Sequence, residues 1–146
     1  MQPIMTTDEV HDFLDREFPQ IHMDGRVLSI TDIRPAELTM RFEPGERHLR
    51  PGATISGPSM VMLCDVAAYA VILAHIGPVA LAVTTSLNIN FLRKPKLSPL
   101  FCDCRILKLG KRLAVIDTIL RQDRPDEPVA QATATYSIPP RHHEVP

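Results

Sequence analysis

Asp65 is the residue whose type and setting point most clearly to chemistry. It lies in the run GPSMVMLCDVAAYAVILAHIG (57–77), which is nearly all apolar from Met60 to Ile76. An ionised carboxylate taken out of water loses much of its hydration energy unless it is paired. A desolvated carboxylate is also a good general base or nucleophile. We therefore expect Asp65 to be catalytic, or else to pair with a base such as Arg50 or to cap a neighbouring loop.

Gly57, at the start of the same run, is the second candidate. A backbone N–H at the positive end of a helix dipole is well placed to stabilise an oxyanion. Pro58 has no N–H, so the possible donors are Gly57 and Ser59. The alternative is that Gly57 only turns the chain into the helix. Ser56 as a nucleophile would need a His–acid pair, which no motif supplies.

Basic residues gather in one part of a nearly neutral chain. The net charge is −1, yet residues 93–112 carry seven bases against the single acid Asp103. A local basic strip suits a small anionic ligand better than nucleic acid. Charge-assisted contacts to phosphate are the expected role, and ordinary surface solvation is the alternative, for Arg93, Lys94, Lys96, Lys111 and Arg112.

Cysteines and histidines give no sign of a metal site. Cys64, Cys102 and Cys104 are not at zinc-ligand spacing and suit a reducing cytoplasm as small buried hydrophobes. His75 ends the apolar run and is expected to be structural. The N-terminus has no signal-peptide pattern, and Met60–Ile76 is short for a membrane span. The sequence therefore predicts a soluble cytoplasmic protein without a metal.

The elements that position these residues can be predicted from periodicity and punctuation. The segment Thr6-Thr7-Asp8-Glu9 resembles a capping box, and the helix that it begins ends before Pro19. Pro58 and Gly77 bound a second helix over 58–76, with Ser56 or Gly57 as its cap. Alternating or apolar runs predict six strands, at Val27–Ile33, Glu37–Phe42, Ala80–Leu92, Leu100–Leu109, Arg112–Arg121 and Pro128–Ile138.

A helix that is apolar on every side must be wrapped by other structure. An antiparallel sheet of about six strands curled around helix 58–76 satisfies this requirement, and the short strand connections favour it. We predict an α+β single domain over 1–146, with an N-terminal helix within 1–20 and a loose tail over 139–146. In the strand 80–92, simple alternation puts Thr84 on the same face as Ser86, Asn88 and Asn90.

Three segments at these intervals resemble the hotdog-fold acyl-CoA thioesterases, in particular the PaaI-like branch. They are HLRPGATISGPSMVMLCDVA (48–67), TTSLNINFLRKP (84–95) and LKLGKRLAVID (107–117). The resemblance implies a hotdog fold, hydrolysis of an acyl-CoA to free acid and CoA, and a homodimer or homotetramer with the site at the subunit interface. It implies no cofactor, no nucleic acid and no membrane partner.

The resemblance also implies roles for individual residues. Asp65 falls at the catalytic carboxylate, Gly57 at the glycine whose N–H polarises the thioester carbonyl, and Thr84 at a hydroxyl that holds the attacking water across a dimer interface. The chain departs from the family pattern at Ser56, where His is usual, at Pro58, which replaces a glycine, and at Arg50, where some relatives have Asn. Arg50 in that position is expected to bind an anionic acyl group or a CoA phosphate. The implied substrate-binding set is Arg50, Ser56, Ser59, Arg93, Lys94, Lys111 and Arg112.

Two other functions remain open at this point. A hotdog enoyl-CoA hydratase or dehydratase would pair a carboxylate with a histidine, and no such pair surrounds Asp65 in the sequence. An acyl-CoA-binding protein without turnover fits the replaced His and Gly.

Overall fold

Helix α2 (Gly57–Ile76) is the centre of the molecule. The computed structural model describes residues 1–23 and 25–140. Ser56 is the N-cap of α2, and its Oγ accepts the Ser59 N–H at 3.3 Å. The helix ends at Gly77, whose φ of +94° lies in the left-handed region that favours glycine. The prediction of a helix over 58–76 is confirmed to within one residue.

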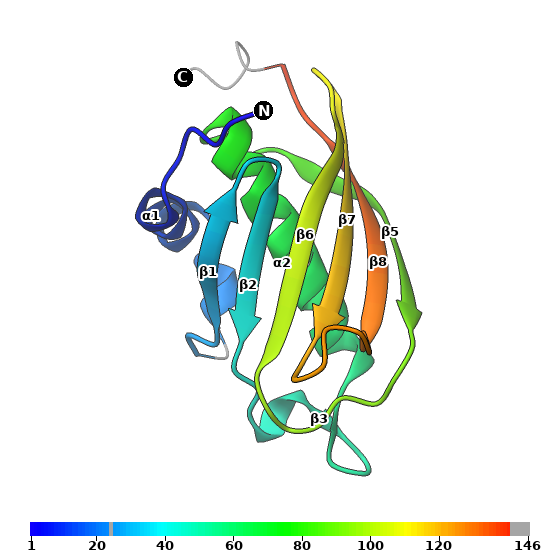
Figure 1. The fold of residues 1–146 in the computed structure, drawn as a ribbon. Coiled ribbons are helices and arrows are strands. Elements are labelled where there is room, and N and C mark those ends of the chain that lie inside the picture. The colour runs from blue at the N-terminus through cyan, green and yellow to red at the C-terminus, as the bar shows by residue number, and fades with distance from the viewer. Residues whose placement is uncertain (24, 141–146) are drawn as a thin grey trace.

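A single antiparallel sheet of six strands covers α2 (Figure 1). Its order is β1-β2-β6-β7-β8-β5, and every neighbouring pair is antiparallel. The strands are β1 (Leu28–Arg34), β2 (Glu37–Phe42), β5 (Val83–Phe91), β6 (Leu100–Leu109), β7 (Leu113–Arg121) and β8 (Ala130–Ser137). All six predicted strands are present, with ends that differ by up to three residues.

The sheet can wrap α2 closely because small side chains lie between them. Ala130, Ala132 and Ala134 of β8 are fully buried, and α2 contacts all six strands. Of the most apolar 18-residue window of α2, 78% is buried inside the protein. The helix is long and apolar enough to cross a membrane, but a core helix has the same properties. Its wrapping is that of a soluble α+β domain.

Helix α1 (Thr7–Glu17) lies beside β1 and contacts both β1 and α2. Its capping box is confirmed: the Glu9 N–H donates to Thr6 Oγ1 at 3.2 Å, and the Thr6 N–H donates to Glu9 Oε1 at 3.0 Å. The helix ends before Pro19, which begins the 3-10 turn η1 (Pro19–His22). The turn η1 lies beside the part of α2 that is only half-buried, at Val61 and Met62.

A small hairpin was not predicted. The segment before α2 contains the 3-10 turn η2 (Glu46–His48) and the paired two-residue strands β3 (Leu49–Arg50) and β4 (Thr54–Ile55). The sequence indicated only a loop rich in Gly and Pro there, because two-residue strands give no periodic signal. Of the tail predicted to be loose, residues 141–146 lie outside the described residues.

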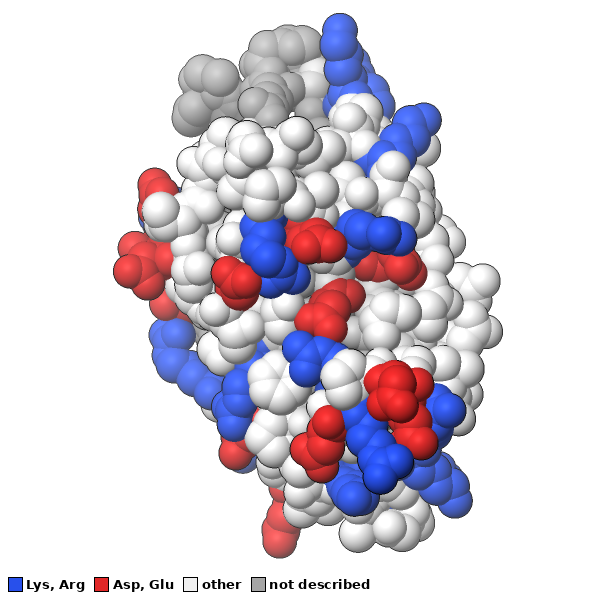
Figure 2. All heavy atoms as spheres, viewed as in Figure 1, with Lys and Arg blue, Asp and Glu red and all other residues white. Residues whose placement is uncertain are grey.

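Charged residues mix over the outer face of the sheet (Figure 2). Asp103 is one example: it bonds Arg121 and accepts the Thr39 hydroxyl at 2.8 Å. Burial raises the pKa of Asp103, but Arg121 and Thr39 outweigh burial, so its pKa lies below the ordinary value. Opposite charges satisfy one another on this face, whereas the chemistry predicted from the sequence lies on the other side, along α2 and β5.

Candidate active site

Asp65 lies half-buried in the third turn of α2, where two hydroxyl groups hold one of its oxygens. Thr84 Oγ1 donates to Asp65 Oδ1 at 2.6 Å, and Tyr136 OH donates to the same oxygen at 2.7 Å. The second oxygen, Oδ2, takes neither of these bonds. Two donors on one oxygen fix the plane of the carboxylate and leave Oδ2 able to accept a proton from water.

Tyr136 was not found from the sequence. Its ring is almost fully buried, and its hydroxyl also lies 2.9 Å from the Asp65 carbonyl oxygen. Burial and the negative charge of Asp65 raise the pKa of Tyr136 well above its ordinary value. The phenol therefore stays protonated and remains a donor to Asp65. The signal in the sequence was a tyrosine ending a row of inward alanines, since a buried Tyr hydroxyl needs a partner.

Thr84 reaches Asp65 because of a β-bulge. The register between β5 and β8 shifts between Thr84 and Ser86, so one extra residue lies in β5. The prediction that Thr84 shares a face with Ser86, Asn88 and Asn90 is therefore wrong. The bulge turns Thr84 inward, while Asn90 stays outside and bonds Gln131 at 3.1 Å. Bulges beside active sites commonly re-aim one side chain in this way.

Two hollows of about 350 Å³ each meet at Asp65. Both are lined by Asp65, Phe18, Tyr69 and Tyr136. The strand-side hollow is completed by Glu17, Ala80, Ala82, Val83 and Thr84. The helix-side hollow is completed by Gln20, Ile21, Pro58, Val61, Met62 and Val66. Neither hollow has a histidine, lysine or arginine among the described residues that line it, and Asp65 is therefore reachable without facing a cation.

Gly57 is the first residue of α2 and lies at a different hollow. The first N–H groups of a helix have no partner within the helix, and the Ser56 hydroxyl accepts from Ser59, not from Gly57. A Cβ on Gly57 would lie 3.3 Å from Cζ of Phe91. The Phe91 ring therefore covers the start of α2. Eight residues separate Gly57 from Asp65, about 12 Å along the helix.

The Gly57 hollow brings together three of the predicted binding residues. It has a volume of about 440 Å³, and Arg50, Arg93 and Lys94 line it beside Gly57. Arg93 also donates to the Pro128 carbonyl at 2.7 Å, which fixes its guanidinium. A glycine N–H and three cations around one hollow form a suitable setting for an anionic group.

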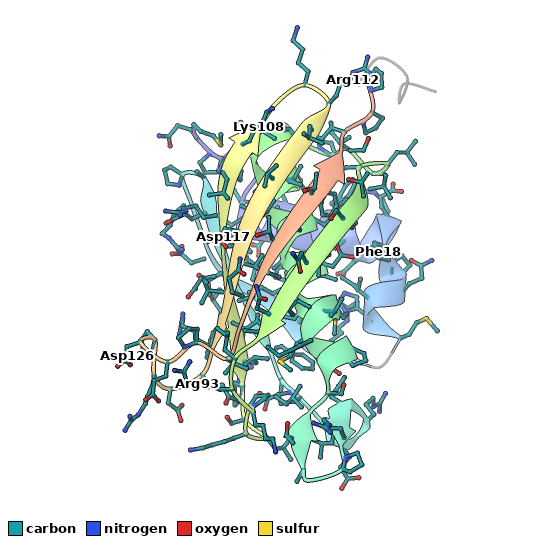
Figure 3. The ribbon with its side chains drawn as sticks, turned by 90° about the vertical axis from the view of Figure 1, so that its right-hand side faces the viewer. Phe18, Arg93, Lys108, Arg112, Asp117 and Asp126 are labelled. Carbon is teal, nitrogen blue, oxygen red and sulfur yellow. The ribbon has the colours of Figure 1, made fainter. Side chains whose placement is uncertain are left out.

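Lys111 and Arg112 lie elsewhere. They line a hollow of about 720 Å³ with Ile76 and Ile138, at the other end of the sheet. Figure 3 shows Arg93 and Arg112 at opposite ends of the molecule. Within one chain, the predicted phosphate-binding residues therefore lie in two groups at opposite ends of the sheet.

The two serines before Met60 serve the helix end. Ser56 Oγ and Ser59 Oγ are 2.9 Å apart, and Ser56 also accepts the Ser59 N–H. Their hydroxyls are thus used within the N-cap. The binding role predicted for Ser56 and Ser59 remains a prediction.

Histidines and cysteines have structural partners. His75 Nε2 accepts the Ala36 N–H at 2.9 Å, and Nδ1 lies 2.8 Å from the Val71 carbonyl, so the expected structural role is confirmed. Cys104 is buried and its thiol donates to the Leu38 carbonyl at 3.2 Å. Burial raises the pKa of Cys104, so it stays a thiol. Among residues 1–23 and 25–140, no group of three His, Cys, Asp or Glu side chains could hold a metal.

Comparison with known proteins places this geometry in a family. The model of the thioesterase superfamily matches residues 52–129, which contain Gly57, Asp65 and Thr84. This chain belongs to the thioesterase superfamily. The predicted thioesterase family and hotdog fold are therefore confirmed, and the superfamily's enzymes hydrolyse thioesters. No curated protein matches the sequence of this superfamily member.

Several solved structures resemble this thioesterase-superfamily chain. A proposed thioesterase from Silicibacter sp. TM1040 is 47% identical over 96% of both chains, with a TM-score of 0.86. A Streptococcus mutans UA159 protein solved bound to acetyl-CoA is 23% identical, over 77% of this chain and 89% of that one, with a TM-score of 0.69. A phenylacetic acid degradation-related protein from Ralstonia eutropha JMP134 is 23% identical, over 76% and 84%, with a TM-score of 0.70. The last two structures share the fold with this chain, and the PaaI-like branch remains a prediction.

Proposed function

We propose that this protein hydrolyses acyl-CoA thioesters to free acid and CoA, with Asp65 as the catalytic group. The observation that carries the proposal is the pair of hydroxyl donors on Asp65 Oδ1 where two hollows meet. None of the ion pairs found within residues 1–23 and 25–140 involves Asp65. Fixed orientation without a neutralising cation is what a general base or nucleophile requires. The acetyl-CoA in the S. mutans structure supports CoA as the thiol.

Asp65 acts on the thioester by one of two routes. As a base, it takes a proton from water while the water oxygen bonds to the carbonyl carbon and the carbonyl electrons move to oxygen. Collapse of the tetrahedral oxyanion breaks the C–S bond, and the CoA thiolate takes the proton. As a nucleophile, Asp65 first displaces the thiolate to form an anhydride that water then hydrolyses. Both routes form an oxyanion that an N–H donor would stabilise.

That N–H donor is Gly57 of a second copy of the chain. Within one chain, Gly57 and Asp65 line different hollows, about 12 Å apart along α2. Gly57 lies beside Phe91, at one end of β5, whereas Asp65 bonds Thr84, at the other end. If β5 pairs antiparallel with its own copy, the Phe91 end of one strand lies beside the Thr84 end of the other. The pairing brings Gly57 of one chain to Asp65 of the partner subunit.

Strand β5 has the properties of such an interface. It is an edge strand of the sheet, so one side of its backbone is unpaired in the described part of the chain. Large apolar side chains are exposed on it and beside it: Val83, Phe91 and Leu92 are 57%, 52% and 50% exposed. An exposed apolar edge strand favours pairing with another strand. A homodimer, alone or within a homotetramer, would cover this edge.

The same pairing would unite the separated basic residues. Lys111 and Arg112 follow β6 at the Val83 end of the sheet, because Leu113 and Val83 both pair with Ser137. In an antiparallel dimer, that end lies beside Arg93 and Lys94 of the other chain. Together these cations would hold the phosphates of CoA, with Arg50 beside the Gly57 hollow. The proposal includes a cytoplasmic location, as the sequence predicts.

Thiol release from acyl-CoAs tests the proposal. The purified protein is incubated with acyl-CoAs of varied chain length and aromatic character, and free CoA is measured with a thiol-reactive dye. Asp65→Asn keeps an amide oxygen for the bonds from Thr84 and Tyr136 but cannot act as a base. We expect it to lower kcat about a thousandfold. Asp117→Asn is the matched control, because Asp117 accepts from Gln131 on β8, away from the hollows at Asp65.

The other outcomes identify the alternatives. Thiol release by Asp65→Asn at the wild-type rate would contradict the proposal. Hydration of an enoyl-CoA without thiol release would point to a hydratase. Binding of acyl-CoAs by the wild-type protein without any turnover would point to an acyl-CoA-binding protein.

A further inference from the structure

We propose that the helix-side hollow holds the acyl group, that Phe18 forms its outer wall, and that the substrates carry compact, uncharged, apolar acyl groups. This inference rests on the proposed function, because it concerns the same Asp65 site. It adds the substrate class and names a specificity-determining residue outside the segments that predicted the chemistry.

The helix-side hollow runs from Asp65 toward the start of α2. One wall comes from α2 through Val61, Met62 and Val66, and the opposite wall comes from the α1–η1 junction through Phe18 and Ile21. These five side chains are apolar, and Val66 is buried. An apolar group attached to a carbonyl at Asp65 would therefore leave water on entering this hollow.

Phe18 is held at the hollow by contacts with other rings. Its ring meets Tyr69 edge-on, with centroids 6.0 Å apart, and Tyr69 stacks on Tyr136 at 6.1 Å. Tyr136 in turn holds Asp65 through its hydroxyl. The side chain of Phe18 projects from the end of α1 and is 36% exposed (Figure 3). Phe18 thus connects the wall of the hollow to the catalytic carboxylate and closes its outer side.

The charge around Asp65 selects against anionic acyl groups. Among the described residues that line the helix-side hollow, the only charged side chain is Asp65 itself. The adjoining strand-side hollow adds a second acid, Glu17. A terminal carboxylate on the acyl group would lose water, meet no cation among the described residues that line these two hollows, and face the two acids. Acyl groups that end in a methyl group or a ring have no such cost.

The size of the hollow, and above all its length along α2, selects for compact groups. A dry cavity of roughly 150 Å³ is enough to bind benzene, and the helix-side hollow measures about 350 Å³. An acyl chain of about six carbons fits within it. An extended chain of twelve carbons is about 13 Å long, whereas the hollow follows α2 for only about 10 Å from Asp65 to Pro58. The end of such a chain would therefore leave the hollow and lie in water.

Relative rates with four acyl-CoAs test this assignment in the intact protein. We expect wild-type kcat/KM to favour butyryl-CoA over succinyl-CoA, and hexanoyl-CoA over dodecanoyl-CoA, by about tenfold each. Phe18→Ala opens the outer wall and is expected to remove most of the preference for hexanoyl-CoA over dodecanoyl-CoA. Met62→Trp fills the hollow and is expected to lower the ratio of hexanoyl-CoA to butyryl-CoA by about tenfold. Leu107→Ala, an exposed apolar residue on β6, is the control and should change neither ratio.

A binding measurement separates this inference from the proposed function. S-hexyl-CoA, a thioether that cannot be hydrolysed, should bind wild type more tightly than CoA, and Met62→Trp should abolish that difference while Leu107→Ala keeps it. If no acyl-CoA is hydrolysed but this binding pattern appears, the proposed function fails and the acyl subsite stands. The inference is overturned if Phe18→Ala and Met62→Trp leave the selectivity and the binding difference at wild-type values, or if succinyl-CoA is the better substrate.

Discussion

The groups at the two ends of strand β5 differ in how many of their partners a single chain supplies. At the Thr84 end, the carboxylate of Asp65 has its hydrogen bonds in place, from Thr84 and from the buried Tyr136. At the Phe91 end, the N–H of Gly57 and the cations Arg50 and Lys94 surround an open hollow. One end has a fixed reactive group, and the other has groups suited to hold an anion. We propose from this difference that a complete site takes one end from each of two chains.

Removing the Gly57 N–H is the strongest way to test the Phe91 end. Gly57→Pro deletes that donor at the first position of α2, where proline is favoured, and Ser56 already has the extended ψ of 153° that precedes proline. We expect kcat to fall about a hundredfold or more, as on loss of an oxyanion donor. Gly57→Ala is the control, because it adds a Cβ toward Phe91 but keeps the N–H. Equal rates for the two variants would remove Gly57 from the mechanism.

The two hydroxyl donors test the Thr84 end, with a smaller effect. Tyr136→Phe and Thr84→Val each leave Asp65 Oδ1 with one donor, and we expect kcat to fall about tenfold with KM little changed. Thr85→Val removes a hydroxyl that donates to the Thr135 carbonyl and not to Asp65. Steady-state kinetics should show the lower kcat in Tyr136→Phe and Thr84→Val and a kcat close to wild type in Thr85→Val. If kcat fell as much in Thr85→Val as in Thr84→Val, the bond from Thr84 to Asp65 would have no special role in the reaction.

The cations of the Phe91 end should affect binding and not the chemical step. Arg50→Gln and Lys94→Gln are expected to raise KM about three- to fivefold at low salt, with kcat nearly unchanged. Added salt should reduce the difference from wild type, because exposed charges are screened. Arg105→Gln, on β6 away from the Gly57 hollow, is the matched control. A fall in kcat without a change in KM would show that these residues act on the reaction itself.

Much of the fold and part of the site could be predicted from the sequence. Pro58 and Gly77 bound α2, its apolar surface required other structure on every side, and the six predicted strands could supply it as a curled sheet. Asp65 was evident because a carboxylate in an apolar helix is costly. These features are local or follow from burial, so the sequence contains them.

The rest depended on long-range pairing. The bulge that turns Thr84 inward is set by the register of β5 against β8, and alternation alone gave the wrong face. Tyr136 reaches Asp65 across 71 positions, so no local pattern connects them. Lys111 and Arg112 appeared to join Arg93 and Lys94 because both groups are basic, yet the meander of β6 and β7 carries them to the opposite end of the sheet.

Mixing two inactive variants tests most directly whether the site is shared between chains. Asp65→Asn and Gly57→Pro are unfolded together, refolded as an equal mixture, and assayed for thiol release. A heterodimer pairs the intact Asp65 of one chain with the intact Gly57 of the other, in one of its two sites. The account predicts recovery of about a quarter of wild-type activity, because half of the dimers are mixed. Activity no higher than that of the separate variants, with mixed dimers shown to be present, would contradict it.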